Sequence, residues 1–102
     1  MPYVPVAQVS EFPEGTVKII VAGGQRIALC RAGGAFHAIE DRCSHDNGPL
    51  GEGSLSGTLL ECPRHGAQFD VTTGRPVTLP AVMPVKRFPV KVEGTQILVE
   101  VA

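Results

Sequence analysis

Glycine and proline interrupt this chain throughout its length, and they constrain its fold more than any other feature. The 102 residues include 12 glycines and 9 prolines, which are dispersed rather than clustered. Proline ends or kinks a helix, and no segment between the interruptions shows a sustained apolar repeat near 3.6 residues. The segments are instead rich in β-branched residues, which favour strands. The sequence therefore predicts an all-β fold in a single domain over residues 1–102, with turns rather than linkers at the interruptions.

Short apolar segments between the glycine turns predict the individual strands. In the last two segments apolar and polar residues alternate, which indicates a hairpin with one buried face. A glycine-rich centre over about residues 41–75 separates the strands near the two ends of the chain. We therefore expect an antiparallel β-sandwich or barrel with an inserted loop-rich lobe. The predicted strands cover residues 16–21, 26–30, 35–39, 58–61, 67–70, 88–92 and 96–101.

The charge balance excludes several classes of function. Nine basic residues face ten acidic ones, which leaves a formal charge of −1 and no basic block. Nucleic-acid binders and membrane-surface helices need a concentrated positive face, so we expect neither a nucleic-acid nor a membrane partner. No apolar run is long enough to span a bilayer, and the N-terminus does not resemble a secretory signal. We therefore expect a soluble, cytoplasmic protein.

Two cysteine–histidine pairs in the central lobe carry the chemical signal. The chain has three cysteines, an odd number that does not suit a disulfide framework. Cys43 and His45 are two residues apart, so in an extended loop both side chains point the same way. Cys62 and His65 flank a proline-containing turn that can bring them to one side. A glycine follows each pair, and Gly66 lets the backbone approach a bulky inorganic ligand closely.

Two thiolates and two imidazoles can bind metal in two ways. One zinc ion can take all four ligands in a tetrahedral structural site. Alternatively, a [2Fe–2S] cluster can have both thiolates on one iron and both imidazoles on the other. Structural zinc motifs usually pair like ligands within each loop, whereas each loop here is mixed. The mixed pairs favour the binuclear cluster, and zinc remains the alternative.

The chain resembles the Rieske [2Fe–2S] family at these residues. The spacing C-x-H, sixteen residues, C-x-x-H resembles the family's signature, and residues 62–70 resemble its second cluster loop. Residues 73–81 resemble the stretch that carries its proline loop. Residues 88–94 are similar to the closing hairpin of the small ferredoxins in bacterial ring-hydroxylating dioxygenase systems, whereas the first thirty-five residues match only in pattern. The resemblance implies one cluster per chain, its buried iron on Cys43 and Cys62 and its outer iron on His45 and His65.

Departures from the high-potential branch of the family imply a low redox potential. The two cysteines of that branch's disulfide correspond here to Gly48 and Arg64, and its two hydroxyl donors to the cluster sulfurs correspond to Ala67 and Phe69. Reduction adds one negative charge to a neutral oxidised core, and nearby donors stabilise that charge. Because both hydroxyls are missing, we expect a potential of about −150 mV rather than about +300 mV.

The resemblance implies a one-electron carrier rather than an enzyme. Its electrons would come from an NAD(P)H-dependent flavin reductase and pass to a terminal oxygenase. The chain is too short to be that oxygenase, because only His37 remains for a two-His, one-carboxylate iron site. The alternatives are the small subunit of an assimilatory nitrite reductase, a zinc-stabilised interaction module and a Rieske-like accessory protein. The first often lacks the ligands that this chain possesses.

The remaining chemical side chains have simpler interpretations. We expect Cys30 to be an inert buried thiol and His37 to be a surface or satisfied core residue rather than a ligand. Gly48-Pro49-Leu50 is either a simple turn or an apolar rim through which electrons leave. Most acidic residues near the lobe should be solvated, although some could steer a basic-faced partner. These acids are Asp41, Asp46, Glu52 and Glu61.

Overall fold

The strands form three antiparallel sheets in the computed structural model, which describes residues 3–42, 50–63, 66–77 and 83–101. The sheet orders are β1-β10-β9, β2-β3-β4-β8 and β5-β6-β7. Within the described ranges there is no α-helix, and no helix long and apolar enough to cross a membrane. The elements are β1 (Tyr3–Gln8), the 3-10 helix η1 (Val9–Glu11), β2 (Val17–Ala22), β3 (Gln25–Ala32), β4 (Ala35–Glu40), β5 (Ser54–Ser56), β6 (Leu59–Glu61), β7 (Gln68–Asp70), β8 (Arg87–Phe88), β9 (Val90–Glu93) and β10 (Gln96–Glu100).

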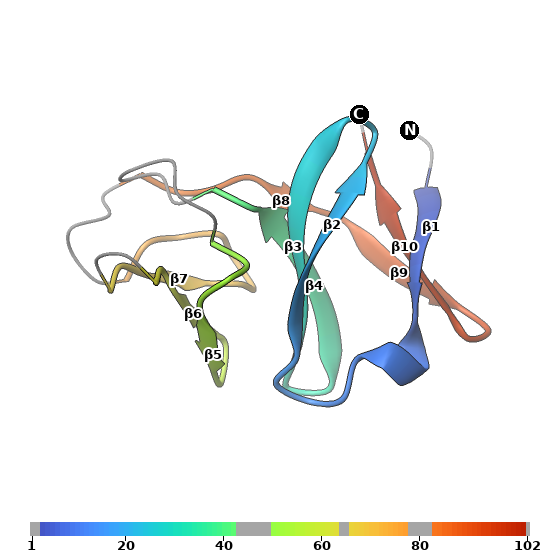
Figure 1. Cartoon of the computed structure of the whole chain (residues 1–102), viewed down its shortest axis with the longest axis horizontal. Helices are drawn as coiled ribbons and strands as arrows, with labels where there is room; N and C mark the ends of the chain where they lie inside the picture. Colours follow the sequence, from blue (N-terminus) through green and yellow to red (C-terminus); the bar gives the residue numbers. More distant parts are fainter. Residues whose placement is uncertain (1–2, 43–49, 64–65, 78–82, 102) are drawn as a thin grey trace.

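The sheet β2-β3-β4-β8 is the centre of the molecule and is covered on both faces. The sheet β1-β10-β9 lies on one side of it, and the small sheet β5-β6-β7 lies on the other (Figure 1). Successive side chains of a strand point to opposite faces, so a strand is apolar over the part that is covered on both faces, as β3 is from Ile27 to Cys30. In β3, Ile27 and Leu29 pack on one side, while Ala28, Cys30 and Ala32 pack on the other.

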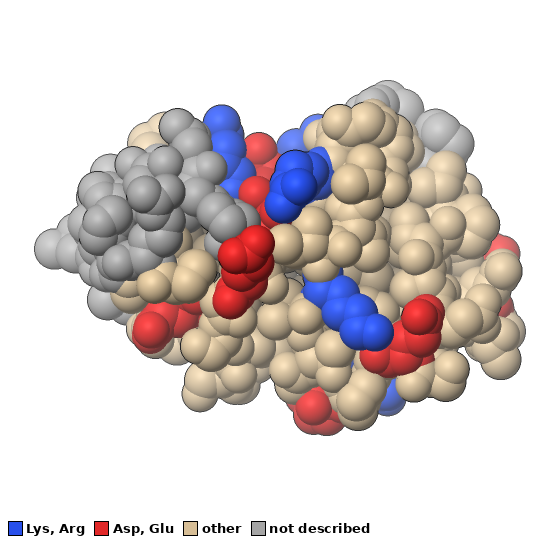
Figure 2. All heavy atoms as spheres, in the orientation of Figure 1, with Lys and Arg blue, Asp and Glu red and all other residues tan. Residues whose placement is uncertain are grey.

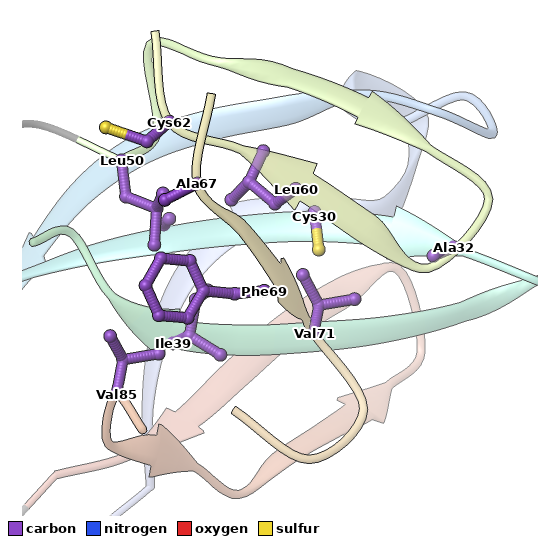
Figure 3. Close-up of a cluster of buried hydrophobic side chains, with 11 residues drawn as sticks. Cys30, Ala32, Ile39, Leu50, Leu60, Cys62, Ala67, Phe69, Val71 and Val85 are labelled. Carbon is purple, nitrogen blue, oxygen red and sulfur yellow. The ribbon is translucent and has the colours of Figure 1, made fainter. Parts of the chain in front are cut away.

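Two clusters of buried side chains occupy the two sides of this central sheet. The barrel cluster lies between the central sheet and β1-β10-β9, and it consists of Phe12, Ala22, Ile27, Leu29, Ala38, Phe88, Ile97, Val99 and Val101. The lobe cluster lies between the central sheet and β5-β6-β7 (Figure 3), and it consists of Ala28, Cys30, Ala32, Ile39, Leu50, Leu60, Cys62, Ala67, Phe69, Val71 and Val85.

The all-β prediction is confirmed, but the start of the chain was not recognised as a strand. The strand β1 pairs antiparallel with β10, from Tyr3 against Glu100 to Gln8 against Gln96. Its register shifts between Pro5 and Ala7, because a proline cannot donate to the ladder. The short strand β5 was also not predicted.

The strand predicted over residues 88–92 is in fact two strands. Arg87–Phe88 (β8) pairs with β4, whereas Val90–Glu93 (β9) pairs with β10. Pro89 stands between them, and its carbonyl accepts a hydrogen bond from the Glu100 amide at 2.9 Å. Strict alternation in the last hairpin was also wrong. Three consecutive residues, Ile97, Leu98 and Val99, are buried, although only Ile97 and Val99 belong to the barrel cluster.

Candidate metal centre

Cys62 is the one predicted ligand within the described residues, and it lies at the base of a tight turn. It directly follows β6, and its amide donates to the Ala67 carbonyl at 2.7 Å. The Gly66 amide donates to the Cys62 carbonyl at 3.1 Å. Gly66 has a φ of 74°, a conformation that L side chains rarely adopt. These two hydrogen bonds explain the position of the glycine in the motif, because they close a turn from Cys62 to Ala67.

The Cys62 side chain is a free thiol that is 1% exposed. Figure 3 shows its sulfur at the outer edge of the lobe cluster, pointing away from the Phe69 ring. The sulfur of Cys30, by contrast, points into the cluster. A thiolate at such an edge position has apolar packing behind it, as Cys62 has in the lobe cluster. The environment of Cys62 therefore fits an iron–sulfur cluster.

Cys43, His45 and His65 lie outside the described residues, which end at residue 42 and resume at residues 50 and 66. The residues that flank these gaps come together. Leu50, which follows the first gap, belongs to the lobe cluster together with Cys62 and Ala67, which flank the second. Two loops that leave from one cluster can reach a common ligand.

Asp41, two residues before Cys43, is buried, so it is an exception to the expectation that most of these acids are solvated. Its side chain is fully buried and pairs with Arg26 at 2.8 Å. Arg26 donates to Asp41 Oδ2 through both Nε and Nη2, and the Gly51 amide donates to Oδ1 at 2.6 Å. A buried carboxylate is tolerated when it is paired and hydrogen-bonded in this way. Nothing in the sequence distinguishes Asp41 from its exposed acidic neighbours.

The other predictions for this region have mixed outcomes. Leu50 is fully buried, so it cannot belong to an exposed apolar rim, while Gly48 and Pro49 lie outside the described residues. Glu52 and Glu61 are exposed, as expected for solvated acids. Asp46 also lies outside the described residues.

Both positions that lack a hydroxyl donor are inside the lobe cluster. Ala67 and Phe69 are fully buried, and neither side chain can donate a hydrogen bond. The described surroundings of Cys62 are therefore apolar at these two positions. This supports the physical basis of the predicted low potential.

Cys30 is the inert thiol that the sequence predicts. It is fully buried, and burial raises the pKa of its thiol to about 12. A thiol with such a pKa stays protonated at neutral pH, so it is neither a good nucleophile nor a good metal ligand.

His37 is partly buried, and its pKa is lowered from the ordinary 6.5, mainly by that burial. The charge of Arg87 lowers the pKa further, whereas the Ala32 backbone and Asp70 oppose the shift. Within the described part of the chain, no group of three or more His, Cys, Asp or Glu side chains could hold a metal ion. His37 is therefore not part of a second metal site there.

On the face shown in Figure 2, basic and acidic side chains are interspersed, without a concentrated region of one sign. Among the described ion pairs, Arg42 lies 3.5 Å from Glu40, and Lys91 lies 3.1 Å from Glu93. Such largely exposed pairs contribute little to stability.

Comparison with known proteins agrees with the geometry. The model of the Rieske [2Fe-2S] domain matches residues 2–89. The ferredoxin component of the naphthalene 1,2-dioxygenase system of Pseudomonas aeruginosa is 35% identical over 92 residues, which cover 90% of this chain and 88% of that protein.

Two solved structures are also similar. The ferredoxin of carbazole 1,9a-dioxygenase from Nocardioides aromaticivorans IC177 superposes with a TM-score of 0.92 at 36% identity, over 97% of both chains. A ferredoxin in a complex of reduced oxygenase and oxidized ferredoxin in carbazole 1,9a-dioxygenase gives a TM-score of 0.90 at 36% identity, over 95% of this chain and 91% of that one. Together with the turn at Cys62 and the two-faced central sheet, these matches show that the chain belongs to the Rieske [2Fe-2S] domain family.

Proposed function

We propose that this chain is the ferredoxin of a ring-hydroxylating oxygenase system. It takes single electrons from an NAD(P)H-dependent flavin reductase and passes them to a terminal oxygenase. Its relatives are ferredoxin components of such systems, and a solved complex pairs one of these ferredoxins with its oxygenase. The chain is a carrier and not itself an enzyme, and we place it in the cytoplasm as one domain over residues 1–102.

The ligands that we propose are Cys43 and Cys62 on one iron and His45 and His65 on the other. When bound, the [2Fe-2S] cluster accepts and gives up one electron. Cys43 and Cys62 would supply thiolates to one iron and so make that iron harder to reduce. His45 and His65 would supply neutral imidazoles to the other iron, which would favour the added electron there.

The packing of the described residues next to both ligand segments carries this proposal. Leu50 and Ala67 follow the two segments that contain the other three ligands, and both pack with Cys62 in the lobe cluster. The lobe cluster excludes water from behind the Cys62 sulfur, since every side chain of the lobe cluster is buried. A redox centre with one apolar side and one outward side suits transfer to a docked partner.

The proposed direction of transfer needs a low potential, and the residues around Cys62 support one. Ala67 and Phe69 offer no hydroxyl to stabilise the charge that reduction adds. A carrier near −150 mV, roughly the low end of the family's range, can reduce an oxygenase centre of similar potential.

The test is electron transfer between purified components. The holoprotein is reduced with dithionite without oxygen, freed of excess dithionite, and mixed with an oxidised terminal oxygenase of a ring-hydroxylating system. We expect its absorbance to return to the oxidised spectrum as the oxygenase takes up one electron per ferredoxin. A fully reduced protein that no such oxygenase reoxidises would contradict the proposal.

The same measurement over a series of salt concentrations tests whether exposed acids steer the partner. If Glu52 and Glu61 contribute to steering, the transfer rate falls as salt rises, because screening weakens long-range attraction. A rate that does not depend on salt rejects steering and leaves the carrier function intact.

A further inference from the structure

The carboxylate of Asp41 lies at the base of the first ligand segment. Its backbone extends the ladder between β3 and β4, because its amide donates to the Arg26 carbonyl at 3.1 Å. Its side chain then accepts from the Gly51 amide at 2.6 Å. Asp41 precedes Cys43 by two residues. Leu50 is the first described residue after the gap at residues 43–49, and Gly51 follows it. One side chain thus joins the two ends of the segment that carries Cys43 and His45.

Each oxygen of this carboxylate has a separate partner. Oδ1 accepts from the Gly51 amide, whereas Oδ2 accepts from Arg26 Nε at 3.1 Å and Nη2 at 2.8 Å. Arg26 is itself fixed in β3, opposite Val21 of β2. The side chain of Asp41 is fully buried, while that of Arg26 is 59% exposed. The pair therefore connects the first ligand segment to the rigid central sheet.

Gly51 fits its place only because it has no side chain. A Cβ at this position would lie 2.5 Å from Ile19 Cγ1 and 3.1 Å from Asp41 Oδ1. A distance of 2.5 Å between two carbons is shorter than van der Waals contact, so either the Ile19 side chain or the Gly51 backbone would have to shift. The Gly51 backbone therefore approaches the central sheet closely at the same place where its amide donates to Asp41.

From these contacts we infer that Asp41 is a positioning residue for the cluster, acting through Gly51 on the segment that bears Cys43 and His45. This inference rests on the proposed ligand set. Asp41 is not one of the proposed ligands; its hydrogen bond to Gly51 fixes the distance between the two ends of the ligand segment. Removing a partner that is hydrogen-bonded directly to a metal ligand commonly changes metal affinity by about 10- to 100-fold. Asp41 acts one step further from the ligands, through Gly51, so we expect an effect at the lower end of that range.

The test compares holoprotein variants by the rate of cluster loss. Asp41→Ala removes the contacts of the carboxylate with Gly51 and Arg26. Gly51→Ala displaces the contact between Gly51 and Asp41 without removing a charge. We expect each to lose the visible absorbance of the cluster about tenfold faster than the unmodified protein in the presence of an iron chelator. Asp41→Asn should have a smaller effect, because its amide oxygen can still accept from the Gly51 amide.

Glu14→Ala is the matched control. Glu14 also accepts two backbone hydrogen bonds, from Gly33 at 2.7 Å and Gly34 at 2.8 Å, in the turn between β3 and β4. Its loss should weaken that turn and leave the rate of cluster loss unchanged. The EPR spectrum of the dithionite-reduced protein gives a second readout, because ligand geometry sets its line shape. We expect an altered line shape in Asp41→Ala and Gly51→Ala, and an unchanged one in Glu14→Ala.

Two results would overturn the inference. One is that Asp41→Ala loses its cluster no faster than Glu14→Ala; the other is that both Asp41→Ala and Gly51→Ala keep the unmodified line shape. If Asp41→Ala does not fold, Asp41→Asn and Gly51→Ala carry the same comparison. A wild-type protein without an iron–sulfur spectrum would instead overturn the proposed function, so the two failures are distinguishable.

Discussion

The two sides of the central sheet are built differently. On the barrel side, long strands pair over many residues, and large side chains such as Leu29, Ile97 and Val99 fill the space. On the lobe side, β5, β6 and β7 have three residues each. The central strand β3 presents mainly small side chains to the lobe, including Ala28 and Cys30. The lobe therefore packs close to the sheet but has little regular structure of its own.

Polar contacts hold the lobe where strand pairing is short. The carboxylate of Asp41 holds Gly51, and Asp70 accepts from both the amide and the hydroxyl of Thr72, at 2.9 and 2.6 Å. These bonds also hold the pKa of Asp70 below its ordinary value. Three short strands are marginal by themselves, and bound metal contributes folding free energy. The comparison indicates a barrel that folds without the cluster and a lobe that depends on it.

The largest expected effect comes from Cys62→Ala. Removing this ligand should abolish cluster binding, because one iron would keep a single thiolate. Hydrogen exchange should then be fast in β5, β6 and β7, while β3 and β10 retain their protection. Iron content and amide exchange by mass spectrometry measure the two effects.

Cys30→Ala is the control for that variant. Cys30 is the other described cysteine of the lobe cluster and is fully buried, but it is not a proposed ligand. This variant should keep a full complement of iron.

Loss of hydrogen-exchange protection in the barrel strands β3 and β10 of Cys62→Ala would contradict the comparison. It would show that the barrel side and the lobe side do not fold independently.

A pair of leucine substitutions sharpens the same comparison. Leu29 in the barrel cluster and Leu60 in the lobe cluster are both fully buried. Replacing a buried leucine by alanine costs about 2–5 kcal/mol. We expect Leu29→Ala to lower the Tm of the whole protein, as measured by far-UV circular dichroism, whereas Leu60→Ala mainly accelerates cluster loss. Equal loss of β10 protection in both variants would mean that the two clusters form one cooperative unit.

A smaller effect is expected from adding a hydroxyl to the lobe cluster. Phe69→Tyr or Ala67→Ser supplies a donor that can stabilise the reduced centre, so each should raise the midpoint potential. A hydrogen bond to a charged group contributes about 1.5–3 kcal/mol, which corresponds to a shift on the order of 100 mV for one electron. Voltammetry measures the shift, and Phe12→Tyr in the barrel cluster is the control that should leave the potential unchanged. Unchanged potentials in both lobe variants would refute this explanation of the low potential.

The smallest expected effect is a pH dependence from His37. Its pKa in the folded protein lies below the ordinary 6.5, so the unfolded chain takes up the proton first as pH falls. His37 therefore lowers stability as pH falls through about 6.5, down to its folded pKa, and has no such effect above that range. The Tm of His37→Asn should decline less on acidification than the wild-type Tm. Parallel Tm curves for the two proteins would contradict this assignment.

The sequence was sufficient for the regular parts of the fold. Glycine turns and β-branched segments locate β2, β3, β4 and β10, because these features act within a few residues of each other. The sequence did not indicate that Pro89 divides one apolar segment between two sheets. This division depends on the strands that pair with each half, β4 with β8 and β10 with β9. The same limit explains why β1 was not predicted, since it pairs with β10, which lies at the other end of the chain.

For the site, the sequence indicated the chemistry and missed a supporting contact. The paired spacing of cysteine and histidine identifies the family, and Cys62 lies where a ligand is expected. All four ligand assignments stay predictions, and Cys43, His45 and His65 also lie outside the described ranges. The burial of Asp41 could not be predicted, because its partners Arg26 and Gly51 are separated from it by 15 and 10 residues.

Pulsed EPR on the reduced holoprotein tests the central claim most directly. If Cys43 and Cys62 bind one iron and His45 and His65 the other, the unpaired electron should couple strongly to two directly bound imidazole nitrogens. Replacing either histidine by cysteine should remove one of these two couplings. A reduced protein with no nitrogen coupling, or a colourless protein that contains zinc and gives no EPR signal, would contradict the claim.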